Sequence, residues 1–122
     1  MFKTILAAVL AFASLALAAS STAAQGESCF YPTQWTNWTA PNDHTIYLRV
    51  GARVFRVDTA GSCTGLRQGA TLITRSHSAQ LCRAIDWDLK VNNGGIVAGC
   101  IVANQTQLTP DQIAALPKGV RP

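Results

Sequence analysis

The four cysteines are the residues of this chain whose chemistry is most constrained by number and spacing. Cys29, Cys63, Cys82 and Cys100 are widely separated, and no two form the Cys-x-x-Cys pair of a zinc knuckle or a thioredoxin-like redox site. An even number of cysteines in a short domain bound for an oxidising compartment predicts structural disulfides. Of the three pairings that four cysteines allow, we favour Cys63–Cys82 with Cys29–Cys100. Cys63 and Cys82 lie between two predicted hairpins, and Cys100 faces the predicted core, where an N-terminal segment bearing Cys29 can cross it.

A second candidate for chemistry is a pair of carboxylates that flank Trp87. Asp86 and Asp88 alternate along a predicted strand, which places both on one face about 7 Å apart. Paired carboxylates can perform acid–base catalysis or bind a cation. Because Lys90 lies on the same face, a solvated strand surface is the favoured interpretation, and a small hydrolase is the weakest functional hypothesis.

The two histidines, His44 and His77, fall in different predicted loops, and no spacing links them. His77 lies between Ser76 and Ser78, but a catalytic dyad is defined by geometry in the fold and seldom by sequence neighbours. The chain has no glycine-rich phosphate loop, nucleophile elbow or zinc-peptidase pattern. We therefore predict no catalytic residue, no metal ligand and no cofactor.

Aromatic and arginine side chains offer a possible binding surface. Aromatic rings provide flat apolar area and cation–π partners for a carbohydrate or a peptide, although in a small domain they also close the core. The residues assigned to this surface are Trp35, Trp38, Tyr47, Arg49 and Arg56.

The chain begins with the pattern of an export signal. Lys3 precedes an apolar stretch over residues 5–19, and Thr22-Ala23-Ala24 suits cleavage by a signal peptidase. This stretch is shorter than the roughly 20 residues that span a bilayer. We predict a helical signal peptide over residues 1–24, a single domain over residues 25–122, and a periplasmic or secreted location with no membrane span after cleavage.

The charge of the chain limits its partners. The formal net charge is +4 at pH 7, and the arginines are scattered, without the basic run of a nucleic-acid arm. We predict no binding to nucleic acid. A mild positive excess is compatible with an anionic envelope polymer or another envelope protein.

Two hairpins are predicted from turn chemistry. Asn93-Gly94 favours a two-residue type I′ turn, and Gly51-Ala52 favours a type II′ turn. In the hairpin that turns at Gly51-Ala52, the predicted register pairs Val50 with Arg53, Leu48 with Phe55 and Ile46 with Val57. Its other face, which includes Tyr47 and Arg56, is polar enough to lie in water. In the second hairpin the predicted register pairs Val91 with Ile96, Leu89 with Ala98, Trp87 with Cys100 and Ile85 with Val102.

The remaining elements complete a mainly β domain. Residues 70–75 are predicted to form a strand, residues 76–80 a loop, and residues 30–38 an extended segment. Thr109, Pro110 and Gln112 form a capping box that starts a short helix, which Pro117 ends. The predicted fold is a small antiparallel sheet or partly open barrel of two hairpins and an additional strand or two, with a short C-terminal α-helix.

The order of these features resembles a known group of proteins. The features are Cys29 with an aromatic segment to Trp38, Asp43 before Thr45-Ile46-Tyr47-Leu48, Cys63-Thr64-Gly65-Leu66, Leu81-Cys82, Cys100, and Leu108-Thr109-Pro110. Over nearly all of the mature chain the pattern is similar to small exported bacterial proteins that carry a four-cysteine domain of unknown function. The resemblance implies a periplasmic β-rich domain and assigns no site residues.

Three functional hypotheses follow for an exported domain of this kind. The first is a non-enzymatic binding or envelope-associated structural protein. The second is an inhibitor of a secreted hydrolase, a lysozyme or a protease, that uses residues 76–79 as an inserting loop. The third is the small hydrolase based on Asp86 and Asp88.

Overall fold

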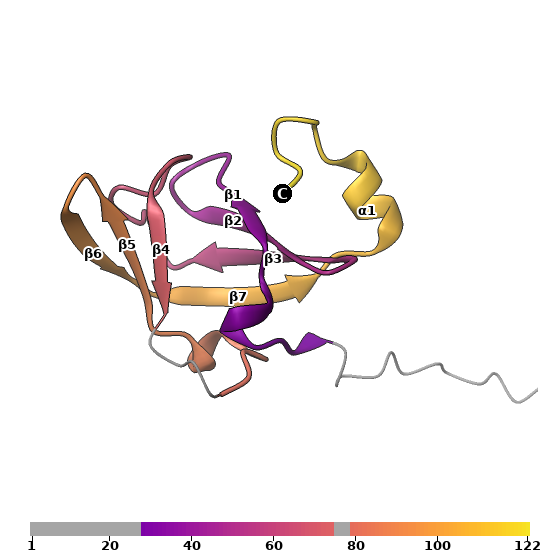
Figure 1. The fold of residues 1–122 in the computed structure, drawn as a ribbon, viewed down its shortest axis with the longest axis horizontal. Helices are drawn as coiled ribbons and strands as arrows, with labels where there is room; N and C mark the ends of the chain where they lie inside the picture. The colour runs from indigo at the N-terminus through magenta and orange to yellow at the C-terminus, as the bar shows by residue number, and fades with distance from the viewer. Residues whose placement is uncertain (1–27, 75–78) are drawn as a thin grey trace, which may run out of the picture.

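The computed structural model describes residues 28–74 and 79–122 of the chain. The predicted signal peptide lies outside the described residues, as do His77 and most of the predicted inhibitory loop. Within the described part, two antiparallel sheets and one short helix near the C-terminus confirm the mainly β fold, and the sheets do not close into a barrel (Figure 1).

The larger sheet has the strand order β1-β2-β3-β7, and the smaller has the order β4-β5-β6. Neighbouring strands in both sheets are antiparallel. The strands are β1 (Asn37–Thr39), β2 (Thr45–Val50), β3 (Arg53–Thr59), β4 (Thr71–Thr74), β5 (Leu89–Asn93), β6 (Ile96–Cys100) and β7 (Val102–Gln107). The short helices are the 3-10 helices η2 (Pro32–Gln34) and η3 (Ala84–Asp86) and the α-helix α1 (Pro110–Ala115).

The β2–β3 hairpin has the predicted register. Val50 pairs with Arg53, and the pairing continues through Leu48 with Phe55 and Ile46 with Val57. Gly51 has a φ of 62°, whereas the following alanine does not have a positive φ, as a type II′ turn requires. The alternation therefore buries one aliphatic face of the hairpin in the core.

The β5–β6 hairpin turns one residue later than predicted. Its central residues are Gly94 and Gly95, with φ values of 62° and 88°, and Asn93 pairs with Ile96. Both central positions of a type I′ turn need a positive φ, which glycine adopts without the steric cost that asparagine incurs. The Asn92 side chain accepts a hydrogen bond from the Gly95 N–H at 3.0 Å and fixes this turn.

This displacement changes the cross-strand partners without exchanging the faces. The predicted pairings of Val91 with Ile96 and of Leu89 with Ala98 were wrong, because Val91 pairs with Ala98 and Leu89 with Cys100. Each residue of β5 meets a residue two positions further along β6. Since the side-chain period of a strand is two, Val91 and Leu89 stay on the buried face.

The predicted strand over residues 85–88 is also wrong. Residues 84–86 form η3, and β5 begins only at Leu89, so Trp87 does not pair with Cys100 and Ile85 does not pair with Val102. The physical cause is the Asp86 carboxylate, which accepts hydrogen bonds from the backbone N–H groups of Cys82 and Arg83, both at 2.9 Å. These bonds hold the chain in a turn and rotate Ile85 to the surface.

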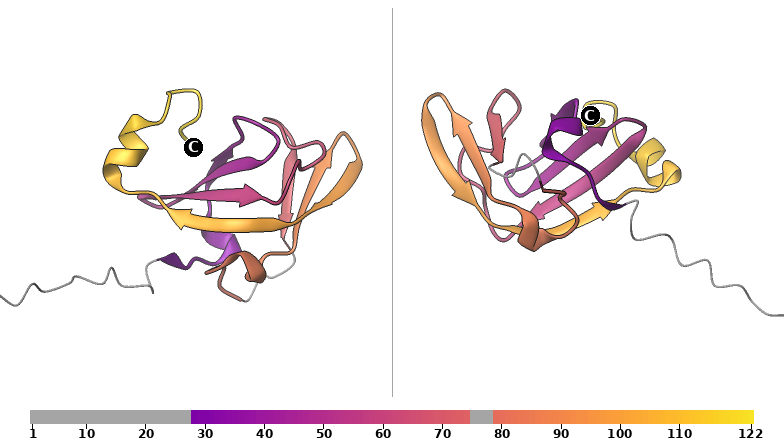
Figure 2. Two further views of the ribbon diagram at one scale, coloured as in Figure 1. Left: turned by 180° about the vertical axis from the view of Figure 1, so that it is seen from behind. Right: turned by 60° about the horizontal axis from the view of Figure 1, so that its bottom comes forward.

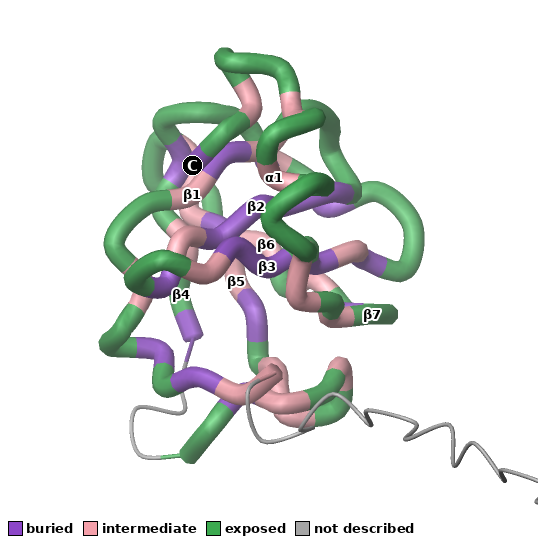
Figure 3. Tube along the Cα trace, turned by 90° about the vertical axis from the view of Figure 1, so that its right-hand side faces the viewer, coloured by how far each residue is buried: buried purple, intermediate pink, exposed green. Residues whose placement is uncertain are grey.

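One bent path connects the two sheets. β6 leads directly into β7 through Ile101, and the chain changes sheets at this residue (Figure 1 and Figure 2). Such a bend lets two short sheets enclose a common core. Leu48, Phe55 and Val57 enter it from the larger sheet, and Leu89 and Val91 from the smaller sheet. Figure 3 shows the buried positions concentrated in the central strands and the exposed ones in the connections.

Phe30 and Leu81 close the core at the end where η3 lies. These two residues form an isolated antiparallel bridge, with hydrogen bonds of 3.2 Å and 2.7 Å in the two directions. Both side chains are buried, and the Phe30 ring lies 4.7 Å from the Phe55 ring. The bridge joins the start of the described chain to the segment before η3.

The prediction that the second face of the β2–β3 hairpin lies in water was wrong, because other parts of the chain cover it. Tyr47 and Val54, both on this face, are buried. The segment after α1 passes over the sheet, and the Thr39 hydroxyl donates to the Val120 carbonyl. Arg49 Nε donates to the Pro122 carbonyl at 2.6 Å.

The start of α1 was predicted correctly. The Thr109 hydroxyl accepts from the Gln112 N–H, and the Gln112 side chain accepts from the Thr109 N–H, which completes the capping box. The last helical residue is Ala115, two residues before Pro117. Arg121 donates to the carbonyls of Ala114 and Leu116 and folds the following segment back on the helix.

The predicted disulfide pairing was wrong. The bonds are Cys29–Cys82 and Cys63–Cys100. The Phe30–Leu81 bridge places Cys29 beside Cys82, with their Cα atoms 4.2 Å apart. The prediction paired Cys63 with Cys82 because both lie between the two hairpins, but the Phe30–Leu81 bridge brings Cys82 to Cys29. Cys63, which is buried, then lies against Cys100.

We predict that removing either disulfide strongly destabilises the protein. The sequence separations are 53 for Cys29–Cys82 and 37 for Cys63–Cys100. In the chain-entropy model each bond stabilises the fold by about 4 kcal/mol. Paired cysteine-to-serine variants, measured by urea unfolding, should each show a loss of this order. Peptide mapping without reduction provides the control, and a peptide that links Cys63 to Cys82 would contradict the structure.

Candidate functional site

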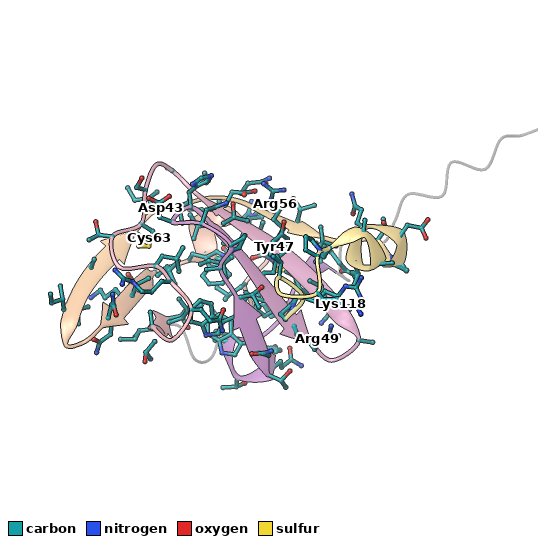
Figure 4. The ribbon with its side chains drawn as sticks, turned by 90° about the horizontal axis from the view of Figure 1, so that it is seen from above. Asp43, Tyr47, Arg49, Arg56, Cys63 and Lys118 are labelled. Carbon is teal, nitrogen blue, oxygen red and sulfur yellow. A yellow bond between two sulfur atoms is a disulfide. The ribbon has the colours of Figure 1, made fainter. Side chains whose placement is uncertain are left out.

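The structure separates the five residues of the predicted aromatic and arginine surface. Trp38 pairs with Leu48 and packs with Trp35 against the core. Tyr47 and Arg56, which pair with each other, lie on the opposite face of the sheet together with Arg49. Figure 4 shows the segment that contains Lys118 passing over the part of the sheet that carries Tyr47 and Arg49.

The arginines on that face have partners within the chain. Arg56 Nε lies 3.0 Å and 3.2 Å from the two carboxylate oxygens of Asp58, and this hydrogen-bonded pair raises the pKa of Arg56. Arg49 is held by the Pro122 carbonyl. A ligand on this face therefore competes with contacts that the folded chain already makes.

His44 belongs to a small polar cluster at the surface. Its Nδ1 lies 3.0 Å from an Asp43 carboxylate oxygen, and both side chains are more than half exposed. The hydrogen bonds from His44 and then from Ser62 lower the pKa of Asp43. The carboxylate lies between the imidazole and the hydroxyl, whereas a nucleophilic triad needs the imidazole in the middle. This cluster has the composition of a triad but not its connectivity.

The two carboxylates of the hydrolase hypothesis have different surroundings. Asp86 accepts the backbone hydrogen bonds of Cys82 and Arg83, which lower its pKa. Asp88 is exposed and lines a surface hollow. Because η3 replaces the predicted strand, the alternation that placed Asp86 and Asp88 on one strand face is absent. The part of the chain that the structure describes contains no group of three or more His, Cys, Asp or Glu residues suited to a metal ion.

The hollow beside Asp88 has two strongly exposed isoleucines in its lining. It has a volume of about 500 Å³ and lies where η3 meets the junction between β6 and β7. Ile85 and Ile101 are 82% and 75% exposed in its lining. The lining residues are Ala84, Ile85, Trp87, Asp88, Leu89, Gly99, Cys100, Ile101 and Val102.

The elements that present these two isoleucines are firmly anchored. Ile85 is the middle residue of η3, whose backbone is held by the Asp86 side chain. Ile101 lies at the bend, where its carbonyl accepts the Ala60 N–H at 2.8 Å and the next residue, Val102, is buried. The disulfide at Cys100 restrains the other side of the bend. The two isoleucines of the hollow are therefore presented by segments that hydrogen bonds and a disulfide hold in place.

Gln105 is a structural residue that the sequence analysis did not identify. Its amide nitrogen donates to the carbonyls of Ser28 and Leu81, both at 3.0 Å, and its amide oxygen accepts from Trp87 Nε1 at 2.7 Å. These bonds connect β7 to the two segments that the Cys29–Cys82 disulfide joins, and to Trp87 in the lining of the hollow. A single glutamine on a polar strand face gave no sequence signal for this role.

Comparison with known proteins assigns no function to this site. No protein-family model matches the chain, and no match was found among curated proteins or solved structures. The predicted resemblance to exported four-cysteine proteins therefore stays a prediction. No helix in the described residues is long and apolar enough to cross a membrane.

We predict that Gln105→Leu lowers the free energy of unfolding by about 2 kcal/mol. The variant removes the acceptor of the Trp87 N–H, and a polar group left unsatisfied away from water costs ~1–3 kcal/mol. Urea unfolding measures the change. Gln107→Leu is the matched control, because Gln107 lies two residues along β7 on the same face and has no side-chain hydrogen bond within the described residues. Equal losses in the two variants would contradict this role.

We also predict that Asp86 makes stability depend on pH. The pKa of Asp86 is lower in the folded state, so its contribution is present above the unfolded pKa of about 3.9 and disappears as the pH falls through the folded value. Asp86→Asn should be about 0.5–1 kcal/mol less stable near pH 7, since an amide oxygen is a weaker acceptor than a carboxylate.

The stability difference between Asp86→Asn and wild type should shrink steadily as the pH falls below about 4. Asp88→Asn serves as the control, because Asp88 does not accept the two backbone bonds that hold η3. A difference that stays constant from pH 7 to pH 2 would argue against a carboxylate effect.

Proposed function

We propose that this protein is a non-enzymatic binding protein of the periplasm or the secreted fraction, and that it contacts a partner protein through the hollow at η3. The observation that carries this proposal is the exposure of two large aliphatic side chains, Ile85 and Ile101, in the lining of one hollow. Burial of each side chain against a partner is worth roughly 1.5–3 kcal/mol. Exposed apolar clusters with a polar border are a common mark of protein contact sites.

The chemistry of the hollow favours an apolar side chain of the partner with a donor beside it. Ile85, Ile101 and the edge of Trp87 provide the apolar walls, and the Asp88 carboxylate provides an acceptor at the rim. A partner segment with a leucine or phenylalanine next to a lysine or arginine fits this arrangement. Tryptophan is also one of the residues that most often dominate the binding energy of a protein interface.

The export part of the proposal is supported by the sequence and by the cross-links. The leader over residues 1–24 has the composition of a signal peptide. Both disulfides suit an oxidising compartment, and all four cysteines take part in them. A partner in the same compartment is therefore the relevant one.

We predict that the double variant Ile85→Ser/Ile101→Ser weakens partner binding by about 100-fold, because it removes roughly 3 kcal/mol of apolar contact. Proteins cross-linked to the exported wild-type protein are identified by mass spectrometry, and the binding of each purified candidate is then measured by calorimetry. Ile73→Ser is the matched control, since Ile73 is an exposed isoleucine on β4 outside the hollow. A partner that binds wild type and the double variant equally would refute the assignment of the hollow.

A further inference from the structure

We propose that two copies of this protein pair through the free edge of β6 and form a two-fold antiparallel dimer with a continuous sheet. This interaction does not rest on the partner proposed for the hollow. It uses the backbone of β6, whose Gly99 and Cys100 also line the hollow, and the side chain of Val97, but not the side chains of Ile85 and Ile101.

The β6 edge lacks the features by which proteins normally prevent edge pairing. Among residues 28–74 and 79–122, β6 is the last strand of its sheet and has β5 as its sole neighbour in the strand order (Figure 1 and Figure 2). Its sequence, Ile-Val-Ala-Gly-Cys, has no charge and no proline. Ile96 and Val97 are 73% and 54% exposed. Natural sheets usually protect such an edge with lysine, proline or a bulge.

The hairpin geometry fixes which backbone groups of β6 are available. A two-residue turn makes its flanking residues, Asn93 and Ile96, a hydrogen-bonded pair. Hydrogen-bonded pairs recur at every second position, so Ala98 and Cys100 also bond to β5. The N–H and C=O groups of Val97 and Gly99 therefore point away from β5, toward the free edge.

These outward groups match a second copy of the same strand. In an antiparallel pair with its axis at Ala98, Val97 of each copy faces Gly99 of the other. This arrangement forms four backbone hydrogen bonds and places the larger side chain beside a residue that has none. The Ala98 residues of the two copies then form the non-hydrogen-bonded pair on the axis.

Other symmetric registers use residues that are not suited to pairing. An axis at Val97 places Gly99 opposite Gly95, a turn residue with a φ of 88°. An axis at Gly99 places Val97 opposite Ile101, whose carbonyl already accepts the Ala60 N–H. With the axis at Ala98, the outward backbone groups of Val97 and Gly99 pair only with each other, and all of these residues lie within β6.

Charge permits this pairing. The one charged residue of the β5–β6 hairpin strands is Lys90 on β5, which pairs with Gly99 on β6. From strand spacing and rise, the two Lys90 residues of a dimer lie roughly 16 Å apart, beyond the screening length of about 8 Å at physiological salt. The net positive charge of each copy therefore opposes the contact only weakly.

The size of the contact predicts a weak dimer. Five residues of one strand cover less than the ~1,200 Å² at which stable interfaces begin. We therefore expect a dissociation constant in the micromolar range and an equilibrium that depends on protein concentration. Such a dimer is populated where the protein is locally concentrated.

Sedimentation equilibrium from about 5 μM to 1 mM tests the proposal. The wild-type protein should change from monomer to dimer over this range. Val97→Pro should raise the dissociation constant at least tenfold, because it removes an outward N–H while every β5–β6 bond remains. Val97→Thr is the matched control and should dimerise like wild type, since it keeps the N–H and the β-branched shape.

Two further measurements keep the result decisive. Val97→Lys should also weaken the dimer, because it places a charge at the paired edge. This variant replaces Val97→Pro in the test if the proline variant does not have the wild-type circular dichroism spectrum and melting temperature. In a mixed isotope-labelled sample, an NMR contact between the Ala98 Hα atoms of the two copies should identify the axis.

A protein that stays monomeric to 1 mM, or a dimer that neither substitution weakens, overturns the proposal. Ile85→Ser/Ile101→Ser should retain the dimer, which distinguishes this test from that of the hollow.

Discussion

The burial of Phe30 is the interaction on which the rest of the structure depends. Two short sheets joined by one bent strand leave an open end, and the Phe30 side chain closes it against Phe55 and Trp87. The segment that carries Phe30 is held by the bridge to Leu81, by the Cys29–Cys82 disulfide, and by hydrogen bonds from the Gln105 amide and the Arg53 guanidinium to its backbone carbonyls. A chain of this size buries too little surface to be very stable without cross-links. The burial of Phe30 and the Cys29–Cys82 disulfide therefore stabilise the same end of the core.

The same closure explains why the candidate site lies where it does. Bringing Cys82 to Cys29 removes the segment before β5 from the sheet, and the Asp86 carboxylate then turns it into η3. This turn exposes Ile85, which lines the hollow together with Ile101 from the bend between the two sheets. The free edge of β6 has a separate origin, because β6 is the last strand in the order of the smaller sheet.

Much of the local structure followed from short sequence patterns. Gly51 after Val50 specified the β2–β3 register, because a turn glycine and an alternating buried face agreed. Thr109, Pro110 and Gln112 specified the start of α1, because their bonds are made within one turn of helix. The hydrophobic alternation placed Val91 and Leu89 in the core even though the turn residue was misplaced. By contrast, the aromatic and arginine surface was not assembled as expected, because strand parity puts Trp38 and Tyr47 on opposite faces.

The sequence by itself determined the class of fold, the presence of two hairpins, the position of the helix and the use of cysteines as cross-links. These features depend on neighbours in the chain, where the backbone limits the possible partners. Only the tertiary structure decided which cysteines pair, where β5 begins and which apolar side chains stay at the surface. Cys29 and Cys82 are 53 positions apart, and their meeting depends on the packing of Phe30 and Leu81. Such contacts between distant segments depend on the shape of the whole core, which no local pattern encodes.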